Sequence, residues 1–289
     1  MKDIFKENWF YHYTNAQGLY GILTDGAFWG TDANYLNDFK EIQLGVNYAR
    51  NWLEINKKEI VSKYGKDISN KLDINMSPNP GSQSGQRMFV CSFSTEMDSL
   101  SQWRAYGSGS GYAIGIHHDH MKQKTKQLGL TLQKCIYDHD SRNNPVSSFL
   151  DNLYDSNYFE NFNSDKLHKI CIGIMRNSIV LKGKAFEQEN EWRLFPDYDF
   201  SVKHKTPQEF RIRNGVFVPY LNFELFPKTE EEKTIRTSID SVCPVLRLMI
   251  GPTPHKELAR DGLSKLLWDK QMEYNFLSPE QSIASYRDW

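Results

Sequence analysis

The sequence has few cysteines, no long apolar run and no excess of charge of either sign. Only four cysteines occur among 289 residues, and no two of them form a Cys-x-x-Cys pair. We therefore expect neither a structural zinc site nor a disulfide framework, and interpret the cysteines as buried thiols of a reducing cytoplasm. No apolar run approaches the ~20 residues of a membrane span, and the opening residues lack the apolar core of a signal peptide. A cytoplasmic protein without a membrane partner is expected.

The charges are nearly balanced, with 35 Lys and Arg against 36 Asp and Glu. Composition alone therefore indicates neither a nucleic-acid nor an anionic-membrane partner. A balanced total charge is still compatible with a local groove lined by basic residues. Hydrophobic residues make up 39% and aromatic residues 13%, which is enough for a sizeable core and argues against disorder of the bulk of the chain. No linker-like segment divides the chain, so we expect a single domain over residues 1–289.

Strand-like and helix-like segments are interleaved without a regular βαβ rhythm, which indicates an α+β fold with a mixed or mostly antiparallel sheet. Strands are expected at 9–14, 27–30, 88–93, 112–116, 130–137, 191–195, 215–219, 245–250 and 272–276. Helices are expected at 16–25, 39–63, 101–106, 119–127 and 255–268. Residues 64–86 are polar and end in a Pro-, Gly- and Ser-rich stretch, which predicts a mobile loop that could act as a lid. Residues 145–181 are predicted to form a helical insertion.

The opening strand carries the first candidate site. Alternation places His12 and Thr14 on one face and Tyr11 and Tyr13 on the other. An imidazole beside a hydroxyl can hydrogen-bond a ribose diol. The alternative is a histidine at a strand end that is bonded to a neighbouring carbonyl.

Two later segments offer polar and aromatic groups. Ser92 and Ser94 share one face of a strand, and because no Gly-x-Ser-x-Gly motif exists we interpret them as hydrogen-bonding residues rather than nucleophiles. Trp103 or Tyr106 could supply a flat surface for a planar ring, although core packing is the commoner use of either. Asn37 could hold a ligand hydroxyl or could simply cap the following helix.

Glu187, Glu189 and Glu191 would line one face of an extended segment, where like charges repel and at least one pKa should rise. The alternative is a charged edge in contact with solvent. The segment His117-His118-Asp119-His120 is contiguous rather than spaced around one ion, so no metal site is expected there.

Taken together, several short motifs resemble those of an uncharacterised bacterial family, known only as a domain of unknown function. In chain order they are His-Tyr-Thr, Cys-Ser-Phe-Ser, Gln-Trp-Arg-x-Tyr, Gly-Tyr-Ala-Ile-Gly-Ile and Glu-x-Glu-Trp-Arg. That family in turn resembles the ADP-ribosyltransferases, which carry a His or Arg on the first core strand, a Ser or Tyr motif on a middle strand and a Glu, often within Glu-x-Glu, on a later strand. The opening is also similar to the His-x-Thr start of toxins that modify DNA bases.

The resemblance implies a split, strongly bent sheet flanked by helices, with NAD in the cleft. It implies that His12 hydrogen-bonds a ribose hydroxyl of NAD, with Tyr13 and Thr14 close by. Tyr106 or Trp103 would stack on the nicotinamide. The further residues expected to contact NAD are Asn37, Ser92 and Ser94.

The resemblance also implies roles for the glutamates. Glu191 would bind the 2′-hydroxyl of the nicotinamide ribose and stabilise the positive charge that develops as the C–N bond breaks. Glu189 or Glu187 would orient or deprotonate the incoming nucleophile. Which of the three is essential stays open.

We therefore expect an NAD-dependent ADP-ribosyltransferase that modifies a protein or a nucleic acid, with a role as a toxin or anti-phage effector that an inhibitor or antitoxin could control. The alternatives are a non-catalytic nucleotide-binding or sensor module and an NAD glycohydrolase. A nuclease would need the clustered glutamates to hold a metal ion.

Overall fold

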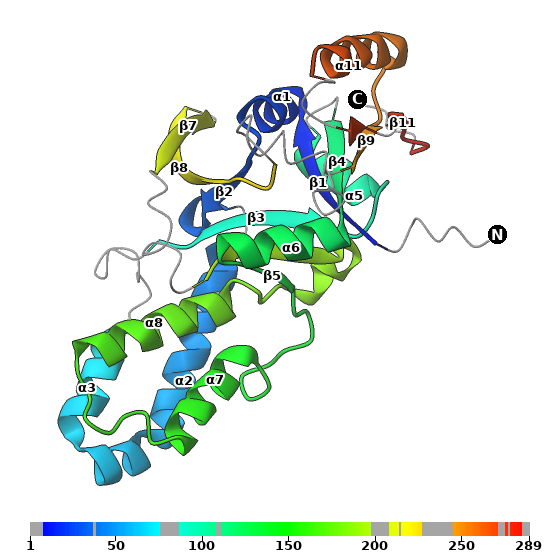
Figure 1. Ribbon diagram of the computed structural model, residues 1–289. Helices are drawn as coiled ribbons and strands as arrows, with labels where there is room; N and C mark the ends of the chain where they lie inside the picture. Colours follow the sequence, from blue (N-terminus) through cyan, green and yellow to red (C-terminus); the bar gives the residue numbers. More distant parts are fainter. Residues whose placement is uncertain are drawn as a thin grey trace.

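The computed structural model describes residues 8–36, 39–75, 87–107, 111–197, 208–213, 215–226, 245–270, 275–276 and 278–284. Within these ranges, helices surround a large mixed sheet (Figure 1). The expected α+β class is confirmed. No helix in the described part of the chain combines the length and the hydropathy that crossing a bilayer requires.

The observed elements follow the expected order closely. The strands are β1 (Trp9–Asn15), β2 (Phe28–Asp32), β3 (Phe89–Ser94), β4 (Gly111–His117), β5 (Leu130–Lys134), β6 (Glu191–Pro196), β7 (Glu209–Arg213), β8 (Val216–Phe223), β9 (Val245–Ile250), β10 (Asn275–Phe276) and β11 (Glu280–Gln281). The α-helices are α1 (Ala16–Asp25), α2 (Phe39–Tyr64), α3 (Lys66–Asn75), α5 (Leu100–Tyr106), α6 (His118–Leu128), α7 (Pro145–Asp155), α8 (Ser164–Ser178) and α11 (Lys256–Lys270). The 3₁₀ helices are η1 (Ala33–Tyr35) and η2 (Lys184–Glu189). Strands β7 and β11 were not predicted.

The first helix shows how local sequence sets these boundaries. The Asn15 side chain accepts a hydrogen bond from the Gly18 amide at the start of α1. This bond satisfies one of the backbone N–H groups that have no carbonyl partner in the first turn of a helix. Gly26 ends the helix in the left-handed conformation, with φ of 64°. Leu19, Ile22 and Leu23 form the buried face, as their helical spacing predicts.

The sheet runs in the order β10-β9-β4-β1-β3-β2-β8-β7, with β6 also on β3 and β5 on β6. Apart from β10 and β11, which run parallel to β9, the strand pairs are antiparallel. The main hydrophobic core lies between this sheet and α1, α6 and α11.

Strand β3 is the point at which the sheet divides. Its residues 91–94 pair with β6 along one edge. The Met88 carbonyl at the start of the strand accepts from the Ala33 amide just after β2, and Ser94 pairs with Tyr11 of β1. In an antiparallel strand, alternate residues direct their backbone groups to the same edge, so β2 and β1 both adjoin the edge that faces away from β6. Between the two contacts this edge of β3 opens into a fork.

Helices α2, α3, α7 and α8 pack together around a hydrophobic core of their own, separate from the core under the sheet. They form a lobe to one side of the sheet (Figure 1). Residues 145–181, which were predicted to be helical, contain α7 and α8, and these two helices make up half of this lobe. The prediction of a loop at 64–86 is wrong for residues 66–75, which form α3, because Leu72 and Ile68 bury an apolar face in the core of the lobe. Residues 76–86 lie outside the described residues.

Gly45 allows the two longest helices of the lobe to approach closely, and this leads to a prediction. A Cβ at Gly45 of α2 would lie 2.9 Å from the Ser178 Cα of α8, a backbone atom that cannot move aside cheaply. We expect Gly45→Ala to lower the free energy of unfolding by about 1–3 kcal/mol in urea denaturation. The control is Gly262→Ala in α11, where a Cβ meets nothing within 4 Å and alanine should stabilise the helix by up to about 1 kcal/mol. Equal effects of the two variants would contradict the prediction.

Candidate functional site

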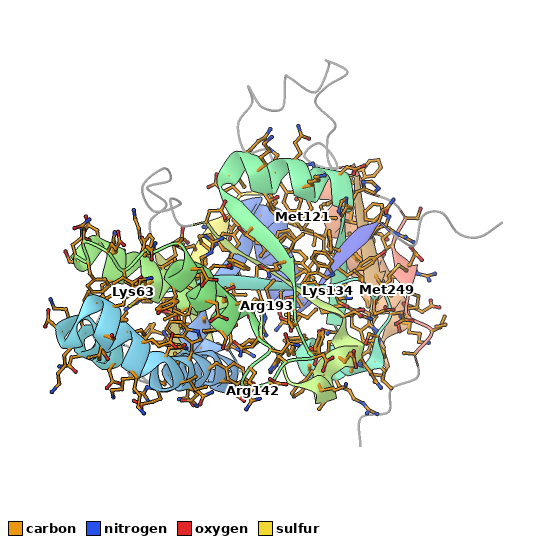
Figure 2. The ribbon with its side chains drawn as sticks, turned by 90° about the horizontal axis from the view of Figure 1, so that it is seen from below. Lys63, Met121, Lys134, Arg142, Arg193 and Met249 are labelled. Carbon is orange, nitrogen blue, oxygen red and sulfur yellow. The ribbon has the colours of Figure 1, made fainter. Side chains whose placement is uncertain are left out.

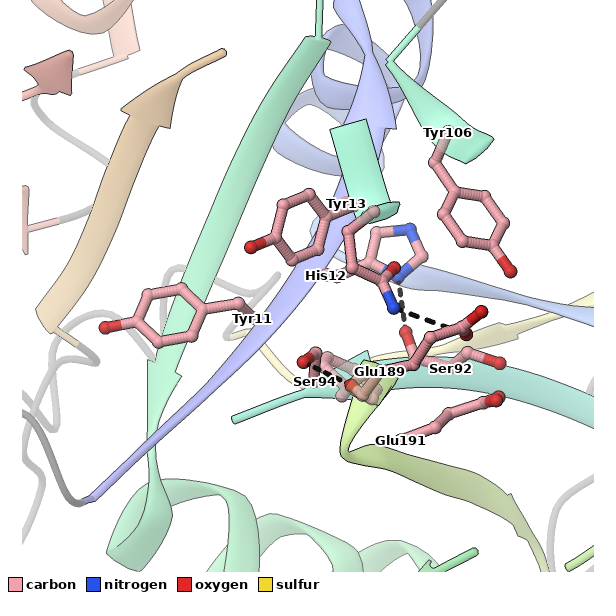
Figure 3. Close-up of a pocket in the computed structure, with 10 residues that line it drawn as sticks. Tyr11, His12, Tyr13, Ser92, Ser94, Tyr106, Glu189 and Glu191 are labelled. Carbon is pink, nitrogen blue, oxygen red and sulfur yellow. Dashed lines mark hydrogen bonds between the residues drawn. The ribbon is translucent and has the colours of Figure 1, made fainter. Parts of the chain in front are cut away.

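A pocket opens at the fork of the sheet. It is lined by Tyr11, His12, Tyr13, Ser92, Phe93, Ser94, Gln102, Tyr106, Glu189 and Glu191 (Figure 3). These residues come from β1, β3, α5 and the junction of η2 with β6. Most of the residues that the sequence singled out therefore meet in one place, although more than a hundred positions separate the first from the last.

The register of the strands explains this convergence. Tyr11 of β1 is paired with Ser94 of β3, and Ser94 is paired with Glu191 of β6. Neighbouring strands are about 4.8 Å apart, so Tyr11 and Glu191 lie roughly 10 Å apart across the central strand. His12 is the next residue along β1, which places it within reach of the same pocket.

The His12 ring fills the fork between β1 and β2. Its Nδ1 lies 2.8 Å from the Ser92 carbonyl oxygen, and its ring packs edge-on against Phe28 and obliquely against Phe93. A carbonyl only accepts, so Nδ1 carries the hydrogen. Burial lowers the His12 pKa to about 4, with the hydrogen bond to Ser92 only partly opposing it. At neutral pH the ring is therefore uncharged, and Nε2 is a hydrogen-bond acceptor.

The two serines have different environments. Ser94 is buried; its hydroxyl donates to the Glu189 carbonyl at 2.6 Å and accepts from the Glu96 amide at 3.0 Å. Ser94 therefore holds the end of η2 in place. The half-buried Ser92 hydroxyl makes no hydrogen bond within the described part of the chain and lines the pocket. Of the two, Ser92 is the one that can bind a ligand.

Glu191 lies in a buried network of charges. Its carboxylate accepts from Arg193 Nε at 2.8 Å and from the Lys182 ammonium. Burial by itself would raise the pKa of Glu191, but Arg193 and Lys182 outweigh it and lower the pKa to about 2. The expectation of a raised pKa is therefore wrong for this residue. Figure 2 shows Arg193 inside the molecule, where Nη1 also donates to the Ile179 carbonyl just after α8.

The glutamates do not share one extended face. Glu187 and Glu189 belong to the 3₁₀ helix η2, and β6 begins only at Glu191, after Asn190 has turned the chain in the left-handed conformation. Glu187 is exposed and does not line the pocket. The Glu189 side chain is 14% exposed and lines the pocket, bonded to Lys182 at 2.8 Å and Gln102 at 3.3 Å.

Sequence reasoning missed Lys182 and Gln102. Lys182 is 1% exposed, and although burial opposes its charge, Glu191 and Glu189 raise its pKa, so it stays protonated. The sequence offered one signal for Lys182, because this lysine directly follows the apolar pair Val180-Leu181. A lysine that continues a buried apolar segment indicates an ion pair, since buried lysines are rare unless paired. Gln102 gave no such signal.

Of the two aromatic candidates for stacking, only Tyr106 lines the pocket. Trp103 is buried; its indole N–H donates to Asp98 at 2.7 Å, and its ring packs edge-on against Tyr13. The structure thus assigns Trp103 to core packing. The Tyr13 hydroxyl donates to the Glu96 carbonyl and accepts from the Ser99 amide, so it too holds the walls of the site.

The remaining candidates lie elsewhere. Thr14 is half-buried beside Gly18 and does not line the pocket. Asn37 lies outside the described residues. His117 caps α6, and His120 bonds the Leu225 carbonyl. Among the residues whose placement is described, no group of three or more His, Cys, Asp and Glu side chains could hold a metal ion.

Comparison with known proteins finds a family model that matches part of the chain. No curated protein and no solved structure matches the chain. The segment from α5 to β6, which supplies Gln102, Tyr106, Glu189 and Glu191 to the pocket, matches a family model. The resemblance to a family of unknown function is therefore confirmed over this segment: residues 102–194 match the family described as Protein of unknown function (DUF2971).

Proposed function

We propose that this protein is an NAD-dependent ADP-ribosyltransferase. One observation carries the proposal: a histidine of the first strand, a serine of the central strand and a glutamate beside the later strand line one pocket, where the sheet forks. These are the residue types and the chain order of the ADP-ribosyltransferases that the sequence resembles.

The pocket offers groups suited to a nucleotide sugar. Nε2 of the neutral His12 can accept from one ribose hydroxyl, and the Ser92 hydroxyl can pair with another. Tyr106 offers a ring for the nicotinamide. When the C–N bond breaks, its electron pair leaves with nicotinamide and positive charge develops on the sugar. A fixed carboxylate near the sugar stabilises that charge more in the transition state than in the ground state.

The acceptor forms the new bond to the sugar, and its proton passes to Glu189, which we propose as the base. The acceptor is a protein or a nucleic acid, and the wider resemblance favours a toxin or anti-phage role in the cytoplasm, with an inhibitor or antitoxin as a further partner.

Labelled NAD tests the proposal. We expect the protein, incubated with NAD labelled in the adenylate portion and with cell extract, to release nicotinamide and to transfer label to macromolecules. Tyr106→Ala should lower nicotinamide release at least tenfold, because it removes a wall of the pocket. The control is Tyr20→Ala, whose ring is 55% exposed on α1. Absence of both release and transfer in the unmodified protein, across protein and nucleic-acid targets, would reject the enzyme.

A second candidate is a non-catalytic nucleotide-binding or sensor module. The observation that favours it is the compensation of charge: Glu189 and Glu191 are paired with Lys182 and Arg193, which leaves little net negative charge for a cationic transition state. A module would bind NAD in calorimetry without releasing nicotinamide. An NAD glycohydrolase would use the same residues with water as acceptor, and free ADP-ribose as the only product would identify it.

A further inference from the structure

The two glutamates of the pocket differ in what their oxygens can still bind. Oε1 of Glu191 accepts from Arg193 Nε at 2.8 Å, and Oε2 accepts from Lys182 and, at 3.4 Å, from Arg193 Nη2. The residue is 3% exposed. Both oxygens are thus occupied by cations of the protein itself.

Glu189 is bound on one side only. Its Oε2 accepts from Lys182 at 2.8 Å and from Gln102 at 3.3 Å, whereas its Oε1 makes no hydrogen bond within the described part of the chain. The side chain keeps 14% of its surface exposed. Figure 3 shows the Glu189 carboxylate on the side of the pocket nearer Tyr106, with Glu191 farther from Tyr106.

Lys182 connects the two carboxylates. Its ammonium contacts Oε2 of Glu189 and Oε2 of Glu191, and its side chain is buried. An ammonium has three donors and no acceptor, so two of the three are used to join the glutamates. Because Glu191 is itself held by Arg193, Lys182 has a fixed partner on one side and orients Glu189 on the other.

We infer that Glu189, rather than Glu191, is the carboxylate that contacts the ligand, and that Lys182, held by Glu191 and Arg193, is the positioning residue that fixes it. The inference rests on the proposed function and transfers to Glu189 the contact with the sugar that the sequence resemblance implies for Glu191. In the proposed reaction Glu189 presents Oε1 to the sugar and receives the acceptor's proton, while the protonated Lys182 gives up no proton.

A double-mutant cycle on nicotinamide release tests this division of roles. Glu189→Gln should lower kcat/KM about 100-fold, as expected for a lost general base. Lys182→Met should lower it about tenfold and move the acid limb of the pH profile upward, because the carboxylates lose a shared cation. The double variant should be no slower than Glu189→Gln alone, since Lys182 acts through Glu189. The control is Lys184→Met, an exposed lysine of η2, which should leave the rate and the profile unchanged.

The outcomes separate the inference from the proposed function. If the losses in kcat/KM of the two single variants multiply in the double variant, or if Glu189→Gln keeps full activity, the inference is overturned but the proposed function is not. No nicotinamide release from the unmodified protein would reject the transferase. Carbon-13 NMR of the glutamate carboxyls needs no activity: Glu191 should titrate at higher pH in Lys182→Met, and an unchanged titration would overturn the role of Lys182. If Lys182→Met does not fold, Lys182→Arg keeps the charge and should retain the pH profile at a reduced rate.

Discussion

Replacing Arg193 with methionine should lower the free energy of unfolding by about 3–5 kcal/mol. Arg193 is 3% exposed and binds Glu191 through Nε and Nη2 and the Ile179 carbonyl through Nη1. The variant leaves a buried carboxylate that, among the residues that the structure describes, keeps only Lys182 as a cationic partner, and it leaves a buried carbonyl without the Arg193 donor. Removing one member of a buried charge network lowers the free energy of unfolding by more than the intact network raises it. The reason is that the remaining charged and polar groups stay buried without their partner.

Urea denaturation measures this effect. The matched control is Arg142→Met, an exposed arginine (Figure 2), which should change the stability by no more than about 0.5 kcal/mol. A loss below about 1 kcal/mol for Arg193→Met would show that the network contributes little to the fold, and would weaken the view that Glu191 is an anchor.

The titration of His12 alone should lower the free energy of unfolding by about 3 kcal/mol as the pH drops from 6.5 to 4. The pKa of His12 is lowered in the fold to about 4, from an ordinary value of 6.5. Between these values the unfolded chain binds a proton that the folded ring does not, so each pH unit costs about 1.4 kcal/mol. Above pH 6.5 His12 is neutral in both the folded and the unfolded protein, so no stability is lost. Below pH 4 His12 is protonated in both, and the loss of stability is complete.

Urea denaturation at a series of pH values in unmodified protein and in His12→Gln checks this prediction. Glutamine keeps a donor for the Ser92 carbonyl but does not titrate, so its stability should be flatter between pH 6.5 and 4. Glu191, whose pKa is lowered from 4.5 to about 2, contributes stability that is lost in a lower window, as pH falls below about 4.5 toward 2. The control is His118→Gln, an exposed histidine at the start of α6. Parallel curves for His12→Gln and the unmodified protein would contradict a His12 ring that stays neutral in the fold.

The two predictions bear on function through the same geometry. A neutral His12 can accept from a ribose hydroxyl, whereas a charged ring could only donate. A loss of activity that follows the protonation of His12 near pH 4, while the fold persists, would link the fork of the sheet to ligand binding.

Local sequence determined most of the elements. Alternation in Trp9–Asn15 separates His12 from Tyr11 and Tyr13, and the structure places His12 against Phe28 and the tyrosines in a different cluster with Trp9. Asn15 and Gly26 bound α1 as their capping chemistry predicts. These features depend on neighbours a few positions away, so the sequence suffices to predict them.

Contacts between distant segments decided the rest. Residues 66–75 are polar enough to be predicted as a loop, and they form a helix because the lobe core covers Leu72. Trp103 packs in a core rather than lining the pocket because Asp98 and Tyr13 surround it. Such outcomes depend on which side chains meet across the fold, which no local pattern specifies.

For the site, the sequence by itself determined that an imidazole, two hydroxyls and a pair of carboxylates occur in a set order. The tertiary structure alone decided their state: the Ser92 carbonyl fixes the tautomer of His12, and Lys182 and Arg193 bind Glu191 on both oxygens and leave Glu189 facing the pocket. The physical reason is that protonation and accessibility depend on burial and on charges brought close in space, and the strand pairings of β3 with β1 and β6 bring them there.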